Sequence, residues 1–273
     1  MIALTASACL LAILFRTPVR SRYWAWRIER SQTPDQQVVY VNLLLNAGAA
    51  AHWGTTVLLE HADVALREYG VLILGTDPGD WSRQRLLSAL ADPVESVRNL
   101  ATMSLARHRD ESVVPQLETI YRSGNDDAAA SACLALARIA KPSAFDALAS
   151  FASEPAGACR RAGLVDALAI IRTTKCVPLL LSMLADHRRC AAAPRLERRQ
   201  MELLRKLQAG GAVDATREWA TPGTDQSVAE RAAGVLVRIT GLDPAFSSEL
   251  PESERQRAEA QWVNWLADKT GVP

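Results

Sequence analysis

Leucine returns at a nearly fixed interval through the middle of this chain. The first series steps by 31, 31 and 32 residues, and its members are Leu86, Leu117, Leu148 and Leu180. A second series steps by 31 and 32 residues, and its members are Leu105, Leu136 and Leu168. Two offset apolar series in one period are typical of stacked helical hairpins, whose units bury their apolar faces only against neighbours. The sequence therefore predicts an all-α solenoid of stacked antiparallel hairpins.

Helical spacing within each period supports this prediction. Val113, Leu117 and Ile120 stand three and four positions apart, which places them on one face of a first helix. The covering second helices are expected over residues 97–107, 129–139 and 161–171. Ala101 and Ala132 hold equivalent positions there, and such small side chains allow close packing of helix axes.

Composition agrees with a helical core made of small and aliphatic side chains. Apolar residues make up 49% of the 273-residue chain but aromatic residues only 5%. A repeat array has one continuous core, so we expect one elongated body. The net charge of +1 gives no overall attraction to nucleic acid or to an anionic membrane. Any electrostatic partner must therefore meet a local patch.

The N-terminus reads as a membrane anchor. Residues 2–15 carry no charge, and the arginines and aromatic rings that follow are Arg16, Arg20, Arg22, Tyr23, Trp24 and Trp26. Such rings favour the headgroup layer of a bilayer. Fourteen helical residues rise about 21 Å, against a hydrocarbon core of about 30 Å, so a span would be short. We predict an apolar anchoring helix at residues 1–20, possible membrane contact through residues 1–26, and a cytoplasmic repeat body. The alternative is a first helix packed on the solenoid.

Three segments follow from these patterns. After the anchor, residues 21–75 are helical but out of register with the leucine series, which predicts an atypical N-terminal cap. Residues 75–79, with the sequence GTDPG, form the expected joint. Residues 79–273 form the repeat array, in which Trp262 and Trp265 belong to a capping C-terminal helix.

No catalytic, cofactor or metal motif is recognisable, so we expect a protein that is not an enzyme and needs no cofactor.

The five cysteines include no Cys-x-x-Cys pair. Cys159 and Cys190 stand about one period apart and are expected on neighbouring helices about 10 Å apart, beyond disulfide reach. Free thiols are therefore expected in a cytoplasmic body, and whether the two ever pair is left open.

Residues 187–206 carry seven Arg and Lys against two Glu and interrupt the period, because Leu207 follows Leu168 by 39 residues. The candidate interaction residues in this insert are Arg188, Arg189, Arg195, Arg198 and Arg199. Clustered arginines bind phosphates or acidic segments through forked hydrogen bonds. The alternative is a solvated face. Nucleic acid is not expected, because no aromatic residues are interleaved for base stacking.

Residues 88–107, SALADPVESVRNLATMSLAR, resemble a HEAT repeat of the short bacterial, phycobilisome-lyase-like type. The matching residues are Asp92 in the hairpin turn and the pair Val97 and Arg98 at the start of the second helix. Arg161 falls in the Arg98 register, whereas Ala130 interrupts it. The resemblance extends over residues 79–271 and implies a scaffold that binds protein partners.

The resulting hypothesis is a non-enzymatic, membrane-tethered interaction scaffold whose protein partners are not identified. Two alternatives remain open. One is a bilin-lyase or chaperone-like HEAT protein, and it follows from the resemblance alone. The other is a binder of anionic ligands, either phosphate or lipid headgroups, through the insert at residues 188–206.

Overall fold

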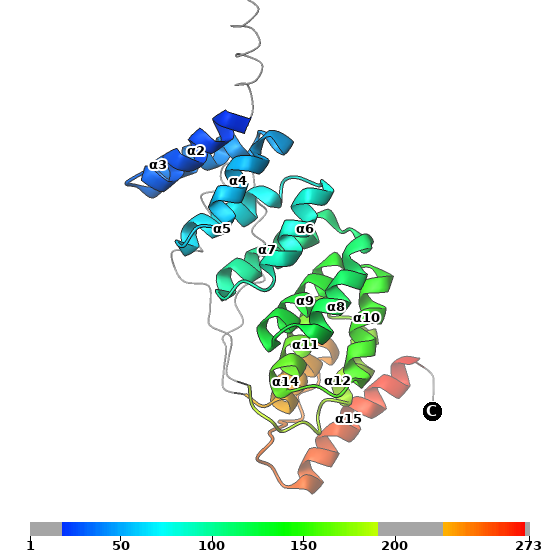
Figure 1. Ribbon diagram of the computed structural model, residues 1–273. Coiled ribbons are helices and arrows are strands. Elements are labelled where there is room, and N and C mark those ends of the chain that lie inside the picture. Colours follow the sequence, from blue (N-terminus) through cyan, green and yellow to red (C-terminus); the bar gives the residue numbers. More distant parts are fainter. Residues whose placement is uncertain (1–17, 191–225, 271–273) are drawn as a thin grey trace, which may run out of the picture. The chain divides into compact units, whose positions relative to one another are not determined.

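The computed structural model describes residues 18–190 and 226–270, and it divides into two compact units (Figure 1). The described part of the first unit is residues 18–108. That of the second is residues 109–190 and 226–270. The described residues contain helices and one isolated β-bridge, between Arg189 and Ser227, but no strand.

The first unit contains six α-helices among its described residues. They are α2 (Pro18–Arg30), α3 (Pro34–Leu45), α4 (His52–Leu59), α5 (Val64–Leu74), α6 (Asp80–Ala89) and α7 (Glu95–His108), with a 3₁₀ turn at Gly48–Ala51. Helices α4 and α5 pair as one hairpin, α6 and α7 as the next, and α5 stacks on α7. Helix α2 packs against α3 and α4.

The second unit repeats the hairpin arrangement. Its described helices are α8 (Val114–Ser123), α9 (Asp126–Ile139), α10 (Pro142–Ser153), α11 (Ala158–Ile171), α12 (Val177–Leu181), α14 (Val228–Thr240) and α15 (Glu252–Thr270), with 3₁₀ turns at Glu111–Val113 and Thr174–Cys176. Helix α9 stacks on α11, and α11 on α14. Stacked antiparallel hairpins thus form both units, and the predicted all-α solenoid fold is confirmed.

The leucine series forms the core as predicted. All seven leucines are at most 2% exposed.

The helix starts also follow local chemistry. Pro115 and Pro178 occupy the first turns of α8 and α12, where a missing N–H removes no helical hydrogen bond. The Thr33 side chain accepts from the Gln36 N–H at 3.4 Å and caps α3.

The predicted segments are only partly described. Most of the anchor, residues 1–17, lies outside the described residues. Among those described, no helix combines the length and the apolar character needed to cross a bilayer. Residues 75–79 connect α5 to α6 inside the first unit, and the division into anchor, cap and array stays a prediction. In α15, Trp262 is fully buried and Trp265 is half-buried.

Arginines hold the hairpin turns of the first unit. Arg67 in α5 donates to the carbonyls of His61 and Ala62, both at 3.0 Å. Arg98 in α7 contacts the carbonyls five and six positions before it in the same way, at 3.0 and 2.7 Å. Arg67 also donates to both oxygens of Asp92, at 2.9 and 3.2 Å, and so ties α5 to the following turn. The predicted arginine register thus begins one repeat earlier, at Arg67.

The second unit uses a different contact at the interrupted position. Ala130 of α9 lies directly against Gly163 of α11. A Cβ atom added at Gly163 would come within 2.5 Å of the Ala130 Cβ and 2.7 Å of its Cα. Because backbone and methyl already meet there, no long side chain fits between the two helices.

Candidate interaction site around a disulfide

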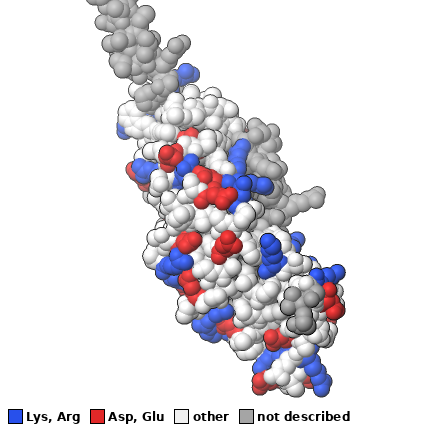
Figure 2. Space-filling view, turned by 90° about the vertical axis from the view of Figure 1, so that its right-hand side faces the viewer, with Lys and Arg blue, Asp and Glu red and all other residues white. Residues whose placement is uncertain are grey.

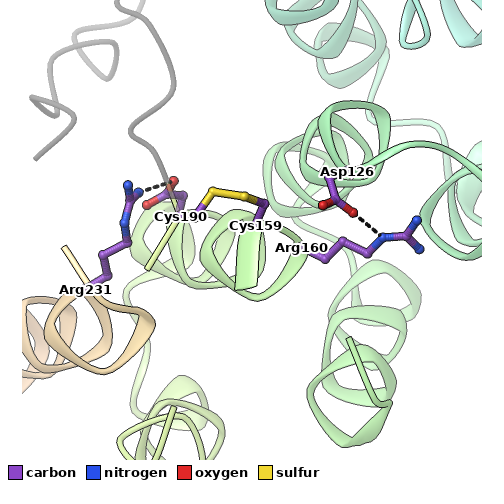
Figure 3. The surroundings of a disulfide bond; sticks show 6 residues. Asp126, Cys159, Arg160, Cys190 and Arg231 are labelled. Atoms are coloured by element: carbon purple, nitrogen blue, oxygen red, sulfur yellow. Dashed lines mark hydrogen bonds and ion pairs between the residues drawn. A yellow bond between two sulfur atoms is a disulfide. The ribbon is translucent and has the colours of Figure 1, made fainter. Parts of the chain in front are cut away.

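A disulfide joins two repeats of the second unit (Figure 3). Cys159 lies in the first turn of α11, and Cys190 follows 31 residues later, with the Cα atoms 4.9 Å apart. The expected separation of about 10 Å and the expected free thiols are therefore wrong. Cys190 is not on a packed helix but lies in a non-helical segment that bonds to the start of α14. In that segment the carbonyls of Asp186 and Arg188 accept from N–H groups of Ala229 and Val228, at 2.9 and 3.0 Å.

The other two described cysteines, Cys133 and Cys176, are buried free thiols. Burial raises the pKa of the Cys133 thiol well above its usual range. A buried neutral thiol is a poor nucleophile. Both side chains therefore act as small core residues, as the sequence predicted.

Arg188, a predicted interaction residue, is held by its own chain. It donates to the two carboxylate oxygens of Asp186 at 2.8 and 2.7 Å and to the Ala156 carbonyl at 3.0 Å. Arg161 forms a second ion pair with the same carboxylate at 3.3 Å. The hydrogen bond from Arg188 is the main cause that lowers the pKa of Asp186, against the effect of burial. The Arg188 guanidinium is thus already engaged within the chain and would have to give up these contacts to bind a ligand.

Arg189 is the other described member of the predicted cluster. Its side chain is 49% exposed, and its guanidinium lies 3.5 Å from Glu249, whose side chain is itself highly exposed. Arg195, Arg198 and Arg199 lie outside the described residues. The structure therefore describes two of the five predicted interaction residues. Both of these side chains are exposed, Arg188 to 56% and Arg189 to 49%, but the Arg188 guanidinium is bound to Asp186.

Arg160 contributes a contact that the sequence did not predict. Its guanidinium donates to the carbonyls of Tyr121, Arg122 and Gly124 at 2.8, 3.3 and 2.6 Å, and to Asp126 at 2.8 Å (Figure 3). These carbonyls belong to the end of α8, where a helix leaves acceptors without intrahelical donors. Arg160 therefore completes the helix end of the preceding repeat.

Charges around the disulfide largely compensate one another. The arginines are Arg160, Arg161, Arg188 and Arg189, and their carboxylate partners are Asp126, Asp186 and Glu249. Figure 2 likewise shows acidic and basic side chains interspersed over the face in view. The described part of this site is thus a network of ion pairs with a small basic excess.

A second polar cluster lies in the first unit. His52 Nε2 is 2.6 Å from an Asp77 oxygen, and the Ser82 hydroxyl donates to that same oxygen at 2.7 Å. The His52 ring stacks on Trp81 with centroids 3.9 Å apart. Burial opposes ionisation of Asp77, but its hydrogen bonds to His52, Ser82 and the Gly79 N–H outweigh burial and lower its pKa. The sequence assigned His52 no role, because its partner is 25 residues away.

This cluster does not have the geometry of a nucleophile with its base. Catalytic serines give their proton to a histidine, whereas Ser82 directs its hydroxyl to Asp77. The small cavity beside it has room for about one water molecule. Nowhere in residues 18–190 or 226–270 do three His, Cys, Asp or Glu side chains group to hold a metal. The contacts fit a joint between α4, α5 and α6.

Hairpins that stack through buried leucines, with polar side chains at their turns, define a helical repeat protein. Residues 55–136 match the family of HEAT repeats, and the predicted HEAT-repeat character is confirmed. The match runs from α4 to α9 and begins before residue 79, where the sequence placed the start of the array.

Two solved structures are similar to the chain. Human deoxyhypusine hydroxylase in complex with glycerol is 14% identical, with 94% of this chain and 99% of that chain covered and a TM-score of 0.40. The complex of CpcE and CpcF of phycocyanin lyase from Nostoc sp. PCC7120 is 16% identical, with 78% and 92% covered and a TM-score of 0.36. Because both TM-scores lie below 0.5, neither likeness supports an inference about activity. No curated protein matches the chain in sequence.

Proposed function

We propose that this protein is a non-enzymatic scaffold that binds a protein partner on the outer surface of its HEAT-like hairpins. The observation that carries the proposal is the use of buried polar side chains to join helices. The Ser96 hydroxyl of α7 donates to Glu68 of α5 at 2.5 Å, and the Ser104 hydroxyl donates to the Val71 carbonyl at 3.4 Å. Polar groups in the interior therefore serve the stacking of repeats. Function is left to the surface, as in other solenoids.

The partner chemistry that suits the basic insert is an acidic segment. Arg189 is exposed beside the disulfide, and Arg195, Arg198 and Arg199 follow in sequence. Arginine forks recognise carboxylates in pairs. Arg188 is the member least suited to this role, since Asp186 already occupies its guanidinium.

A binding experiment tests the scaffold and the insert separately. Proximity labelling from the full chain in its native cell identifies a partner, and the purified pair is then titrated. A saturable complex of fixed stoichiometry is expected. Replacing Arg189, Arg195, Arg198 and Arg199 by Gln should weaken it and reduce its salt dependence. A matched control replaces Arg85, Arg107, Arg257 and Lys269 by Gln.

The outcomes are distinct. If the insert variant bound the partner as tightly as wild type and the control variant, the insert would not be part of the interface, but the scaffold proposal would still hold. If no candidate partner formed a saturable complex with the full chain, the scaffold proposal itself would be wrong.

An anionic ligand at the insert is the second candidate function. The exposed Arg189 favours it, and the Arg188–Asp186 pair argues against a contribution from Arg188. Inorganic phosphate and anionic vesicles, titrated separately, distinguish the two ligand sources. The lyase or chaperone-like alternative gains no support from any contact among the described residues.

Tethering through residues 1–20 is a further part of the proposal. It rests on the charge-free sequence of residues 2–15 and the arginines and rings that follow. The full chain should sediment with membranes and require detergent for release. Full recovery in the soluble fraction without detergent would contradict the tether.

A further inference from the structure

Large apolar side chains are exposed mainly on α2, α3 and α4. Among the described residues, six of the seven such side chains lie here: Val19, Tyr23, Trp26, Val39, Leu43 and Trp53. The seventh is Val263 in α15. This concentration sets α2, α3 and α4 apart from the rest of the described chain.

The exposed rings of α2 follow one stripe. Val19, Tyr23 and Trp26 are four and three positions apart, so they share a helix face. Ala25 and Ile28, on the other side of the helix, are at most 1% exposed. Helix α2 therefore has two apolar stripes, one buried in the unit and one directed to solvent.

Each exposed aromatic ring in this region is in contact with an arginine side chain. Arg22 lies 5.2 Å from the centroid of the Trp53 ring, and Arg30 lies 5.2 Å from the Trp26 ring. Arg27 lies 6.0 Å from the Tyr23 ring and donates to its hydroxyl at 3.1 Å. These six residues, Arg22, Tyr23, Trp26, Arg27, Arg30 and Trp53, are the aromatic–arginine face. A cation–π contact holds each guanidinium over the face of its ring.

The face is also locally basic. Residues 18–59 contain four arginines but only two carboxylates, Glu29 and Asp35. The chain as a whole carries a net charge of only +1. Exposed indole and phenol rings mixed with arginines are typical of surfaces that lie in the headgroup layer. There the rings reach the acyl boundary while the guanidinium groups meet lipid phosphates.

We propose that the aromatic–arginine face is a peripheral binding surface for a bilayer of anionic phospholipid. The proposal deepens the predicted tether, because α2 begins three residues after the charge-free segment 2–15. It is independent of the protein scaffold. The helix lies on the membrane and does not cross it, since α2 has only 13 residues and carries four arginines.

Residue-resolved footprinting tests this orientation. The full chain is bound to vesicles of phosphatidylcholine with phosphatidylserine, exposed to hydroxyl radicals and analysed by mass spectrometry. Tyr23, Trp26 and Trp53 should be protected in the bound protein, whereas Trp265 in α15 serves as the internal control and should not change. If the protein is bound but these three rings are oxidised as in free solution, the proposal is overturned, although the tether through residues 2–15 still holds.

A charge variant supplies the second readout. Arg22, Arg27 and Arg30 are replaced by Gln in the full chain, and the control replaces Arg107, Arg257 and Lys269 by Gln. The face variant should partition to anionic vesicles at least about tenfold more weakly than wild type, with unchanged helicity. Equal partitioning of wild type and the face variant overturns the proposal. Tighter binding of single-stranded RNA than of vesicles also overturns it, since rings and arginines can stack on bases.

Discussion

Consecutive second helices are joined in two different ways in this protein. Between α5 and α7 the joint is polar: Arg67 and Asp92 form a forked ion pair whose side chains are 14% and 12% exposed. Between α9 and α11 small residues meet at the interrupted arginine position, where Ala130 is in direct contact with Gly163. The ion pair of Arg160 with Asp126 joins only the first turns of these two helices. The same leucine period surrounds both joints. The period therefore sets the spacing of helices, whereas the chemistry of each joint is chosen locally.

The largest effect should come from the leucines that both regions share. Leu86→Ala in the first unit and Leu148→Ala in the second should each lower the free energy of unfolding by about 2–5 kcal/mol, because each leaves a cavity in a closed core. Urea denaturation measures both. Leu43→Ala, at an exposed position of α3, is the control and should change stability by less than about 0.5 kcal/mol. A control-sized loss at either buried leucine would show that the two regions do not share one register.

The disulfide should stabilise only the second region. It closes a loop of 31 residues, and the loss of chain entropy in the unfolded state predicts about 3–4 kcal/mol. Cys190→Ser should remove this contribution, and reduction of wild type should give the same denaturation midpoint as the variant. If a reducing agent left the wild-type midpoint unchanged, the covalent link would not contribute to stability.

The polar joint should fail when one charge is removed. Asp92→Ala leaves the Arg67 guanidinium without its carboxylate and removes the acceptor of the Val94 N–H, at 2.8 Å. A loss of about 3 kcal/mol is expected, as for other buried pairs deprived of one partner. Asp92→Asn keeps an acceptor and should lose less. A double-mutant cycle with Arg67→Ala measures the coupling, and a coupling below about 0.5 kcal/mol would contradict a polar joint.

The small-residue joint should fail when one methyl group is added. Gly163→Ala places a Cβ inside the contact with Ala130 and should destabilise by about 1–3 kcal/mol through overpacking. Gly234→Ala is a matched control, because Gly234 is also helical but nothing lies within 4 Å of its added Cβ. The control should gain up to about 1 kcal/mol from helix propensity. Thermal denaturation of the two variants should therefore shift in opposite directions.

The smallest effect is expected at Tyr121. Its ring stacks on Phe151 with centroids 3.7 Å apart, and its buried hydroxyl has no hydrogen-bond partner within the described part of the chain. Burial raises the pKa of Tyr121 to about 12. Tyr121→Phe keeps the stack and removes an unsatisfied group, so stability should be unchanged or slightly higher. A loss above about 1 kcal/mol would indicate a partner for the hydroxyl.

Sequence patterns predicted the fold well because each pattern acts within one repeat. Leu117 and Leu148 mark buried positions by spacing alone, and Pro115 marks a helix start. Arg67 could also have been found, since it stands 31 residues before Arg98. Its segment, residues 21–75, is out of register with the leucine series, which hides the match.

The site was less predictable because its contacts form outside the period. Cys190 meets Cys159 because residues 186–190, which follow the end of α12 and its turn, are non-helical and bond to the start of α14. His52 and Asp77 meet through a loop between helices. Spacing that assumes packed helices gives no distance for such segments. The pairing of Arg188 with Asp186 likewise depends on a local turn and not on the charge of the insert.

Arg160 shows where the cooperative unit of this protein lies. The end of α8 is finished by a side chain that belongs to the next hairpin. A chain cut between α9 and α10 would keep a complete helical hairpin in sequence but lose the donor for its exposed carbonyls. Insertion or deletion of one whole repeat here would also separate donor from acceptor. A single hairpin is thus structurally incomplete, because hydrogen-bond donors for the end of its first helix come from the neighbouring repeat.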